Sequence, residues 1–488
     1  MVFKIPKEIL SVAETLQKAG FEAYLVGGCT RDLFMDKKPK DWDITTNATP
    51  EEIQKLFKNT FYENDYGTVG VVNEGVEDET LKVVEVTPYR IEETYSDKRR
   101  PDKVIFAKKL EDDLKRRDFT VNAIAYDPVK HDIFDLFRGE QDLKDKIIRA
   151  VGVAEERFDE DALRIMRAIR LATELDFTIE TETGDAIKKH APNLKKIAIE
   201  RVREEFSKIV MSKNPMRGIT LMHQHEILKH IVPELEIGIG CEQNGDHIYD
   251  VWEHTLRAAQ HSADREWPLH VRLGALFHDI AKPETRRWLE EKKDWTFYGH
   301  DVVGGKIARK ILERLKYSNE IIDTVTKLVR WHLFFSDIDK ITLSAVRRLV
   351  RNVGPENVWD LMKVRACDRI GMGRPKEKPY RLRKYESMIE EATRAPVTVG
   401  MLKIDGSAIM KLTSEKPGPR IGWILHALLE EVLDDPKYNT KKYLEKKVIE
   451  LAALTDAKLK KVGEAGKKKR EEEEEKEVSE IRKRYFVK

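Results

Sequence analysis

Two aspartates separated by one residue, Asp41 and Asp43, have the clearest chemical potential in this sequence. They lie in Lys40-Asp-Trp-Asp-Ile44, a segment typical of a β-strand, and side chains two residues apart on a strand point to the same face. Carboxylates on one face can hold Mg²⁺, which proteins bind with one or two carboxylates and the phosphate oxygens of a substrate. The spacing therefore predicts metal-assisted chemistry at a phosphate, with Trp42 turned the other way into a core.

A glycine turn precedes these carboxylates. A strand over 22–26 is expected to enter Gly27-Gly28, and a short helix is expected to begin near Thr30. Backbone N–H groups and a helix N-terminus would converge there, where an anion could bind. An isolated Asp-x-Asp is also common in solvated turns, and a glycine pair alone is unspecific. In this order and spacing, the two features together favour nucleotidyl transfer.

Further polar side chains follow. Glu85, on a strand predicted over 81–87, could add a third carboxylate to the metal site or could be a solvated strand position. Four more candidate side chains lie among apolar residues in segment 112–123, namely Arg116, Arg117, Asp118 and Asn122. Buried polar groups need partners, so a structural ion-pair network is one interpretation of this segment.

A helix predicted over 157–170 carries Asp161 and Arg164, which are three residues apart and therefore neighbours on its surface. Cytosine and adenine both present an amino donor beside a ring-nitrogen acceptor. A carboxylate beside a guanidinium matches that pattern, whereas guanine and uracil present the opposite polarity. An ordinary helix ion pair, worth roughly 0.2 to 0.5 kcal/mol, explains the same spacing, and the spacing alone favours it.

Histidines and aspartates recur from His247 onward. The candidate metal ligands among them are His254, His278, Asp279, His300, His332 and Asp368. Imidazole and carboxylate suit transition metals. Any one of these histidines by itself is more often a packed core residue than a ligand. The His278-Asp279 pair lies on an apolar segment and is followed by Lys282-Pro283.

These motifs resemble the class II tRNA nucleotidyltransferases, which are the CCA-adding enzymes and their bacterial poly(A) polymerase relatives. The resemblance covers residues 20–435, and its motifs are Gly27-Gly28-x-x-Arg31-Asp32, Asp41-x-Asp43, the RRDFTxNA segment 116–123 and the EDxxRxxR segment 160–167. The histidine series resembles an HD-type phosphohydrolase domain. Segment 199–208 resembles the last motif of the neck, which braces the base-reading helix.

The resemblance implies roles for individual residues. Asp41, Asp43 and Glu85 would be catalytic, with Asp41 and Asp43 holding two Mg²⁺ ions. The nucleotide-binding residues would be Gly27, Gly28, Arg31, Asp32, Arg117, Asp118, Asn122, Glu160, Asp161, Arg164 and Arg167. Asp161 and Arg164 would read the base, supported by Glu160 and Arg167. His254, His278, Asp279 and Asp368 would hold one divalent metal, Mg²⁺, Mn²⁺, Co²⁺ or Ni²⁺, with His300 and His332 near a second.

The implied fold class is α+β. A nucleotidyltransferase head with a small mixed β-sheet and helices is followed by an all-α neck, an HD-type helical domain and a helical tail. The expected domains are a catalytic head (1–150), a neck that binds the base and the RNA 3′ end (151–240), the HD domain (241–375), a helical tRNA-binding region (376–455) and a charged helical or disordered tail (456–488).

Composition adds limits to this interpretation. Of the 488 residues 36% are charged, but the net charge is only +2, so global charge argues neither for nor against nucleic acid. Cys29, Cys241 and Cys367 are far apart, which favours a reducing compartment over a disulfide framework. Because no apolar run approaches the ~20 residues of a membrane span, we expect a cytoplasmic protein without a membrane partner.

The predicted reaction is attack of an RNA 3′-hydroxyl on the α-phosphate of CTP or ATP, which adds CCA to tRNA without a nucleic-acid template, alongside phosphoesterase activity of the HD domain. The partners would be tRNA, CTP and ATP, and the protein a monomer or homodimer. Alternatives are an A-adding enzyme, a poly(A) polymerase, an HD phosphohydrolase whose head only binds nucleotide, and an RNA-binding scaffold. The loop predicted over 89–104 is of full length for the family, which disfavours addition of cytidines alone.

Overall fold

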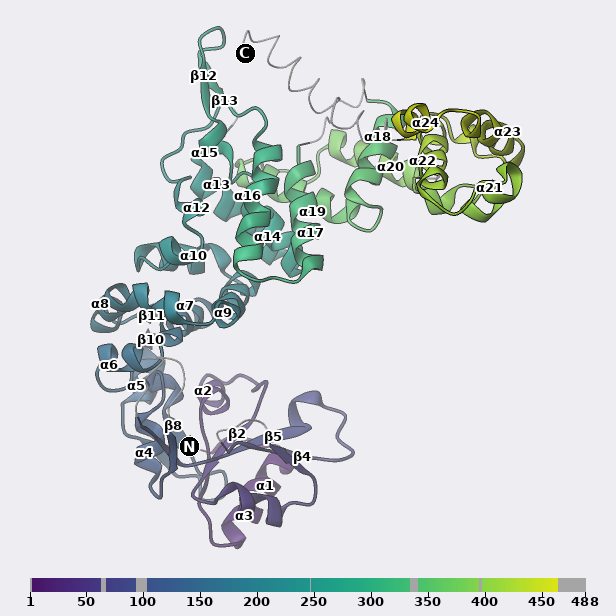
Figure 1. Cartoon of the computed structure of the whole chain (residues 1–488). Helices are drawn as coiled ribbons and strands as arrows, with labels where there is room; N and C mark the ends of the chain where they lie inside the picture. Colours follow the sequence, from purple (N-terminus) through teal and green to yellow (C-terminus); the bar gives the residue numbers. More distant parts are fainter. Residues whose placement is uncertain are drawn as a thin grey trace. The chain divides into compact units, whose positions relative to one another are not determined.

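The computed structural model describes residues 2–62, 67–93, 103–245, 247–333, 341–394 and 397–463. The chain divides into two compact units, Met1–Pro233 and Glu234–Lys488. Most of the strands belong to the first unit and helices dominate the second, so the α+β class predicted from the sequence is confirmed (Figure 1).

A mixed seven-stranded sheet, in the order β3-β4-β5-β2-β1-β8-β9, is the frame of the first unit. Its strands are β1 (Ala23–Leu25), β2 (Asp43–Thr46), β3 (Thr60–Tyr62), β4 (Val69–Val72), β5 (Val83–Pro88), β8 (Ile124–Tyr126) and β9 (Ile133–Asp135). β2 and β5 are parallel, and the other neighbours in the sheet are antiparallel. The register of β2 on β5 places Asp43 opposite Glu85.

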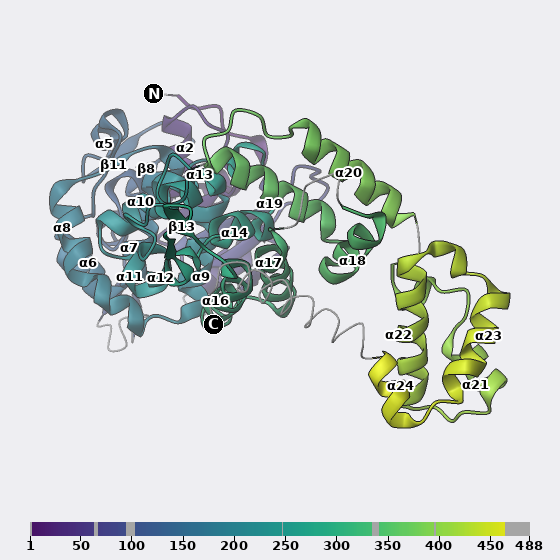
Figure 2. The same ribbon diagram turned by 90° about the horizontal axis from the view of Figure 1, so that it is seen from above.

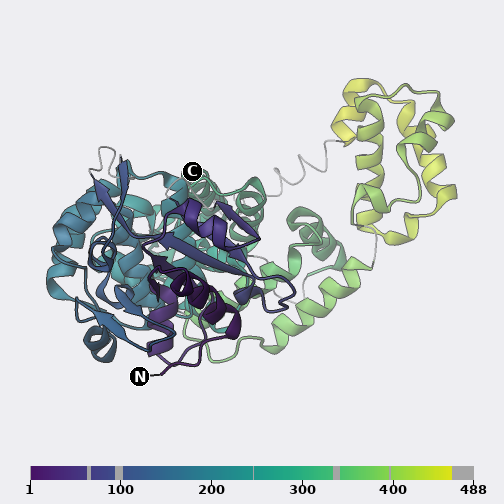
Figure 3. The ribbon, with the colours of Figure 1, turned by 90° about the horizontal axis from the view of Figure 1, so that it is seen from below.

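Two helices, α1 (Lys7–Lys18) and α3 (Pro50–Leu56), pack apolar side chains on this sheet. Figure 3 shows α1, the darkest helix, lying against the strands. The chain leaves α1 through Gly20, whose φ of +91° suits a glycine. α3 begins with a capping box between Thr49 and Glu52. In the sequence, the helical spacing of apolar residues over 4–19 and the proline and acidic residues that follow Thr49 favour these two helices, and the structure confirms both.

Shorter elements complete the head. They are α2 (Gly28–Phe34), the hairpin of β6 (Arg90–Glu93) and β7 (Lys103–Phe106), α4 (Leu110–Lys115), and α5 (Gly139–Asp145). The prediction of an irregular loop over 89–104 is wrong at both ends, because these ends pair as antiparallel strands. The middle of that segment lies outside the described residues.

The neck predicted over 151–240 is mainly helical. Its helices are α6 (Ala154–Glu160), α7 (Leu163–Leu175), α8 (Thr181–His190), α9 (Ile199–Met211), α10 (Pro215–Gln224) and α11 (Leu228–Ile231). It is not purely helical, because β11 (Thr178–Ile179) pairs in parallel with β10 (Ile147–Ile148). The prediction of one continuous helix over 157–170 is also wrong, because the helix is interrupted at Asp161. The Asp161 carboxylate accepts a hydrogen bond from the Leu163 N–H at 2.9 Å, a local bond that competes with helix continuation.

The second unit is built mainly from helices. In order they are α12 (Pro233–Glu236), which crosses the boundary between the units, α13 (Val251–Asp264), α14 (Leu269–Phe277), α15 (Lys282–Thr285), α16 (His300–Arg314), α17 (Asn319–Trp331), α18 (Leu343–Val353), α19 (Val358–Gly371), α20 (Tyr380–Thr393), α21 (Gly406–Thr413), α22 (Pro419–Asp434), α23 (Lys441–Ala452) and α24 (Asp456–Gly463), with a hairpin of β12 (Arg287–Leu289) and β13 (Asp294–Thr296). α13, α14, α17 and α19 pack as one group, and α21–α24 pack as another (Figure 2).

Three further predictions from the sequence concern membrane helices, cysteines and the charged tail. Within the described ranges, no helix is long and apolar enough to cross a membrane. The three cysteines are buried free thiols. The charged tail predicted over 456–488 begins with α24, and everything after residue 463 lies outside the described residues.

Candidate active site

Asp43 stands at the centre of a group of acidic side chains in the head. It is the first residue of β2, while Asp41 precedes the strand, so the prediction that both aspartates lie on one strand is wrong. Trp42 is 2% exposed, which confirms that it points into the core. Burial, Glu85 and Asp41 raise the pKa of Asp43 to about 7, and Arg117 acts against them. A half-buried carboxylate with two acidic neighbours fits a cation-binding role, because a cation would relieve their repulsion.

Gly27 brings the backbone close to this carboxylate. Its φ is +75°, in the region that favours glycine. A Cβ atom at this position would lie 3.3 Å from the Asp43 Oδ2 atom and 3.4 Å from the Arg117 Nη1 atom. A side chain would therefore crowd both charged groups, so the turn depends on glycine for conformation as well as for space.

A chain of polar contacts runs from α2 to α7. Arg31 donates to Asp32 at 3.0 and 2.8 Å and to the Asn122 Oδ1 atom at 2.8 Å. Asn122 in turn donates to Asp118 at 3.1 Å, and Arg167 donates to the other oxygen of Asp118 at 2.8 and 2.6 Å. Burial acts to raise the pKa of Asp118, but Arg167 and Asn122 hold it well below its ordinary value. Five of the predicted nucleotide-binding residues thus form one network.

The predicted base-reading pair is arranged differently from the expectation. Arg164 donates to Glu160 at 2.6 Å and to the backbone oxygen of Arg116 at 3.0 Å. Asp161 instead pairs with Arg201 at 3.0 Å. The interpretation of Asp161 and Arg164 as a helix ion pair is wrong, because Asp161 follows the last residue of α6 and does not lie one turn before Arg164 on a continuous helix. The structure does not test their reading of a base, which stays a prediction.

α9 supports α7 as the neck motif over 199–208 predicts. Arg170 on α7 donates to Glu205 on α9 at 2.6 Å, and Glu205 is only 4% exposed. Leu163, Met166 and Ile169 are buried on α7, as their helical spacing predicts.

Sequence reasoning missed Asp113 in this region. Its side chain is fully buried and lies 2.6 Å from Arg116 and 3.0 Å from Arg117. The signal was available, because Asp113 precedes the two arginines by three and four residues at the end of α4.

A second cluster, here called the HD centre, lies by itself in the second unit. It consists of His254, His278, Asp279, His300, His332 and Asp368. The nitrogen and oxygen atoms of His254, His278, Asp279 and Asp368 lie within 4.8 Å of one another, as do those of Asp279, His300 and His332. All six residues are buried. Among the described residues these are the two groups of three or more such ligand atoms, and the carboxylates around Asp43 do not form a third.

The hydrogen bonds of three histidines in the HD centre are those expected of metal ligands. The Nδ1 atoms of His278, His300 and His332 lie 2.7, 2.6 and 2.7 Å from backbone carbonyl oxygens, so Nδ1 carries the proton and the Nε2 lone pair faces the centre. The Nε2 atoms of His254 and His278 are 2.9 Å apart. Two facing imidazole nitrogens at that distance must share a proton or a cation. Either divalent metal or protons can therefore occupy this centre.

Asp279 belongs to both ligand groups. Its Oδ2 atom lies 2.9 Å from His254 Nε2, and its Oδ1 atom lies 3.2 Å from His300 Nε2. Burial acts to raise the pKa of Asp279, but His278 and Lys282 hold it well below the ordinary range. Burial lowers the pKa of His254. Burial also acts to lower the pKa of His278, but Asp279 and Asp368 outweigh it and raise this pKa to about 10. A proton on His278 would thus compete with a metal.

Three side chains beside the HD centre, those of Gln243, His247 and Lys282, were not among the predicted site residues. Lys282 lies 2.7 Å from Asp279, donates to Gln243 at 2.6 Å and lies 3.4 Å from the His247 Nε2 atom. Burial first, and Lys282 second, lower the pKa of His247 to about 4, so this ring is neutral near pH 7 and can accept from the lysine. The three-residue spacing of Asp279 and Lys282 was the available signal.

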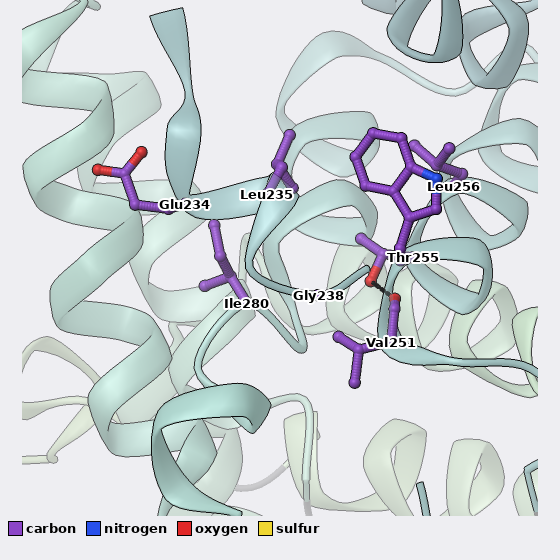
Figure 4. Close-up of a pocket in the computed structure, with 8 residues that line it drawn as sticks. Glu234, Leu235, Gly238, Val251, Thr255, Leu256 and Ile280 are labelled. Atoms are coloured by element: carbon purple, nitrogen blue, oxygen red, sulfur yellow. Dashed lines mark hydrogen bonds between the residues drawn. The ribbon is translucent and has the colours of Figure 1, made fainter. Parts of the chain in front are cut away.

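A small cavity near α13 does not compete as a functional site. It has a volume of about 10 Å³ and is lined mainly by apolar side chains such as Leu235, Val251 and Ile280 (Figure 4). Thr255 turns its hydroxyl away to its own helix and donates to the Val251 carbonyl at 2.6 Å. This volume has room for about one water molecule.

Comparisons with known proteins match the segments of the chain that carry the two clusters. The family model "Poly A polymerase head domain" matches residues 23–149, "Probable RNA and SrmB- binding site of polymerase A" matches 176–237, and "HD domain" matches 245–373. The CCA-adding enzyme of Lactiplantibacillus plantarum is 33% identical over 426 residues, which cover 86% of this chain and 90% of that enzyme. The chain belongs to the CCA-adding enzymes. Among them it is of class II and carries an HD domain.

Other members of the family support the same assignment. The CCA-adding enzyme of Lactobacillus delbrueckii subsp. bulgaricus is 33% identical over 435 residues, covering 89% of this chain and 95% of the relative. The solved CCA-adding enzyme of Bacillus stearothermophilus, in complex with CTP, has a TM-score of 0.67 and 27% identity, over 91% of this chain and 96% of that one. The Thermotoga maritima enzyme complexed with tRNA, at 19% identity and a TM-score of 0.53, shares the fold.

Proposed function

We propose that this chain adds C, C and A to the 3′ end of tRNA from CTP and ATP, without a nucleic-acid template. The observation that carries the proposal is the acidic group around Asp43 beside the glycine turn, in a chain that matches CCA-adding enzymes over most of its length. The complexes of solved relatives with CTP and with tRNA support these partners.

The chain's own residues have defined tasks in this proposal. Divalent cations held by Asp41 and Asp43, two Mg²⁺ ions by our prediction, would supply charge neutralisation at the transferred phosphate. The backbone of the Gly27 turn, Arg31 and Arg117 would bind the triphosphate and orient it for in-line attack by the RNA 3′-hydroxyl. Asp161 and Arg164 would accept and donate the two hydrogen bonds that cytosine and adenine share.

The arrangement around Arg164 adds a requirement to base reading. Its guanidinium is anchored by Glu160 and by the Arg116 carbonyl, at the start of the RRDFTxNA segment. The side chain proposed to read the base is therefore fixed to the segment proposed to hold the triphosphate. Such anchoring would place the base and the phosphates of one nucleotide at a constant separation.

The test uses three tRNA transcripts that end at the discriminator base, after one C, and after CC. Each is incubated with Mg²⁺ and CTP, ATP or both, and the products are resolved at single-nucleotide resolution. Growth of the first transcript by three residues is the expected result. Growth of the CC-ending transcript alone, by one A, would identify an A-adding enzyme, and long A tracts would identify a poly(A) polymerase. No incorporation on any transcript would contradict nucleotidyl transfer and leave the scaffold and phosphohydrolase alternatives.

A second activity is proposed for the HD centre, a metal-dependent phosphoesterase acting on RNA 3′ ends or cyclic phosphates. It is supported by the two buried ligand groups that share Asp279. The test is hydrolysis of 2′,3′-cyclic nucleotides in the presence of Mg²⁺, Mn²⁺, Co²⁺ or Ni²⁺, with Asp279→Ala as the control for contaminating enzymes. Hydrolysis that the Asp279 variant loses would support it, while a wild-type protein inactive with all four metals would contradict it.

A further inference from the structure

The carboxylate of Asp113 is buried beneath the proposed triphosphate site. It is fully inaccessible, and its Oδ1 atom accepts from Arg116 at 2.9 and 2.6 Å. Its Oδ2 atom accepts from Arg117 at 3.0 Å and from the Thr45 hydroxyl at 3.2 Å. Burial acts to raise the pKa of Asp113, but the two guanidinium groups hold it below its ordinary value. The carboxylate is therefore charged and has several donors, as a buried anion requires.

The contact with Thr45 places Asp113 on the catalytic face of the sheet. Thr45 follows Asp43 by two residues on β2, and the two side chains therefore point to the same face. Thr45 lies opposite Thr87 on β5, two residues beyond the pairing of Asp43 with Glu85. The end of α4 thus sits directly over the strands that carry the acidic group.

Arg117 lies between two carboxylates with different tasks. Its Nη2 atom contacts Asp113, while its Nη1 atom faces the Gly27 turn, at a point that is itself next to Asp43. The Arg117 side chain is 16% exposed, and its Nε atom has no hydrogen-bond acceptor among the described residues. The guanidinium is therefore not saturated by this part of the protein, and Asp113 supplies its hydrogen-bonded anchor.

The alternative partner for Arg117 is Asp43. The Asp43 Oδ2 atom and the Arg117 Nη1 atom lie 3.3 and 3.4 Å from one point, the position that a Cβ atom at Gly27 would take, so the two side chains are already neighbours. Without Asp113, the free guanidinium would be drawn to Asp43 and to the other acids around it. A guanidinium paired with Asp43 would compete with a divalent cation and would no longer face the triphosphate.

We propose that Asp113 is a positioning residue for nucleotidyl transfer, which holds Arg117 at the Gly27 turn for the triphosphate and keeps it from pairing with Asp43. The proposal rests on the function proposed above. It predicts one effect on nucleotide binding and a second on the requirement for divalent metal. It predicts no effect on the choice between bases, because the side chains that Asp113 contacts are those of Arg116, Arg117 and Thr45, and neither Asp161 nor Arg164 is among them.

The experiment compares Asp113→Asn and Asp113→Glu with wild type in single additions to tRNA transcripts. Asparagine keeps the shape and removes the charge, whereas glutamate keeps the charge and displaces it. Asp112→Asn is the matched control, since this neighbouring carboxylate is partly exposed on the same helix. KM and kcat are measured for CTP and for ATP, each across a Mg²⁺ titration, and thermal melting reports folding.

Both Asp113 variants should raise KM for CTP and ATP by the same factor, about tenfold or more, as expected for loss of a hydrogen bond between charged groups. The Mg²⁺ concentration for half-maximal rate should rise, kcat at saturation should change little, and Asp112→Asn should behave as wild type. Unchanged KM in a folded Asp113 variant would overturn the proposal, as would a loss confined to kcat. Failure of both variants to fold would also overturn it, because the carboxylate would then serve the fold. An inactive wild type would instead contradict the function itself.

Discussion

The raised pKa of Asp43 predicts that removal of divalent cations makes the folded protein sensitive to pH. Burial, Glu85 and Asp41 raise this pKa from 3.8 to about 7, so the folded state binds the proton more tightly than the unfolded chain. The stability due to that proton is fully present below pH 4 and is lost as the pH rises through 7. A tenfold change in proton affinity corresponds to about 1.4 kcal/mol, so the ionised carboxylate costs roughly 4 kcal/mol at neutral pH.

Asp43→Asn provides the comparison, because asparagine has the shape of the protonated side chain and does not ionise. In the presence of a chelator, the free energy of unfolding of the wild type should fall relative to that of Asp43→Asn by up to about 4 kcal/mol between pH 4 and 7. Above pH 7, the difference between the two free energies should stay constant. That is a difference of several degrees in melting temperature. Asp36→Asn is the matched control, since Asp36 is exposed and its φ of 54° suits asparagine.

The assay is thermal melting across this pH range, with and without millimolar Mg²⁺. Above pH 7, Mg²⁺ should raise the melting temperature of wild type and of Asp36→Asn, but not that of Asp43→Asn, because the metal binds the ionised carboxylate. Asp43→Asn should also abolish nucleotide transfer. Parallel pH profiles for wild type and Asp43→Asn would refute the electrostatic reasoning, and substantial residual transfer would refute the metal-binding role.

Three further predictions concern separate parts of the chain. Arg164→Ala should raise incorporation of UTP and GTP relative to CTP and ATP by about tenfold or more, because a good bidentate pair discriminates bases by about 1–3 kcal/mol. Unchanged selectivity in single-nucleotide incorporation would argue against base reading. Asp279→Ala should remove metal from both groups of the HD centre, and His332→Ala should remove metal from one. Elemental analysis gives the metal content per chain, and both variants should still extend tRNA. Equal metal content in the two variants would contradict the shared role of Asp279. Gly139→Ala should lower the free energy of unfolding by about 1–3 kcal/mol in urea, because the new Cβ would lie 2.3 Å from the Thr120 backbone oxygen; an unchanged midpoint would show that the backbone moves freely there.

Local patterns were enough for several of the elements and for most members of the two polar clusters. The amphipathic spacing of α1 and α7, the capping box of α3 and the inward orientation of Trp42 follow from periodicity and capping, which depend on residues a few positions apart. The histidine and aspartate series also appeared in the sequence as a set, and the structure brings its six members within reach of one another.

The partner of each charged side chain was decided only by the tertiary structure. The sequence places Asp161 beside Arg164, but the fold offers Arg201 to the first, and Glu160 and a backbone oxygen to the second. Likewise, only packing puts Asp113 over the face that carries Asp43 and makes Asp279 common to two ligand groups. The physical reason is that helix and strand periodicity act over neighbouring residues, whereas buried charges select among all donors and acceptors that folding brings within hydrogen-bond distance.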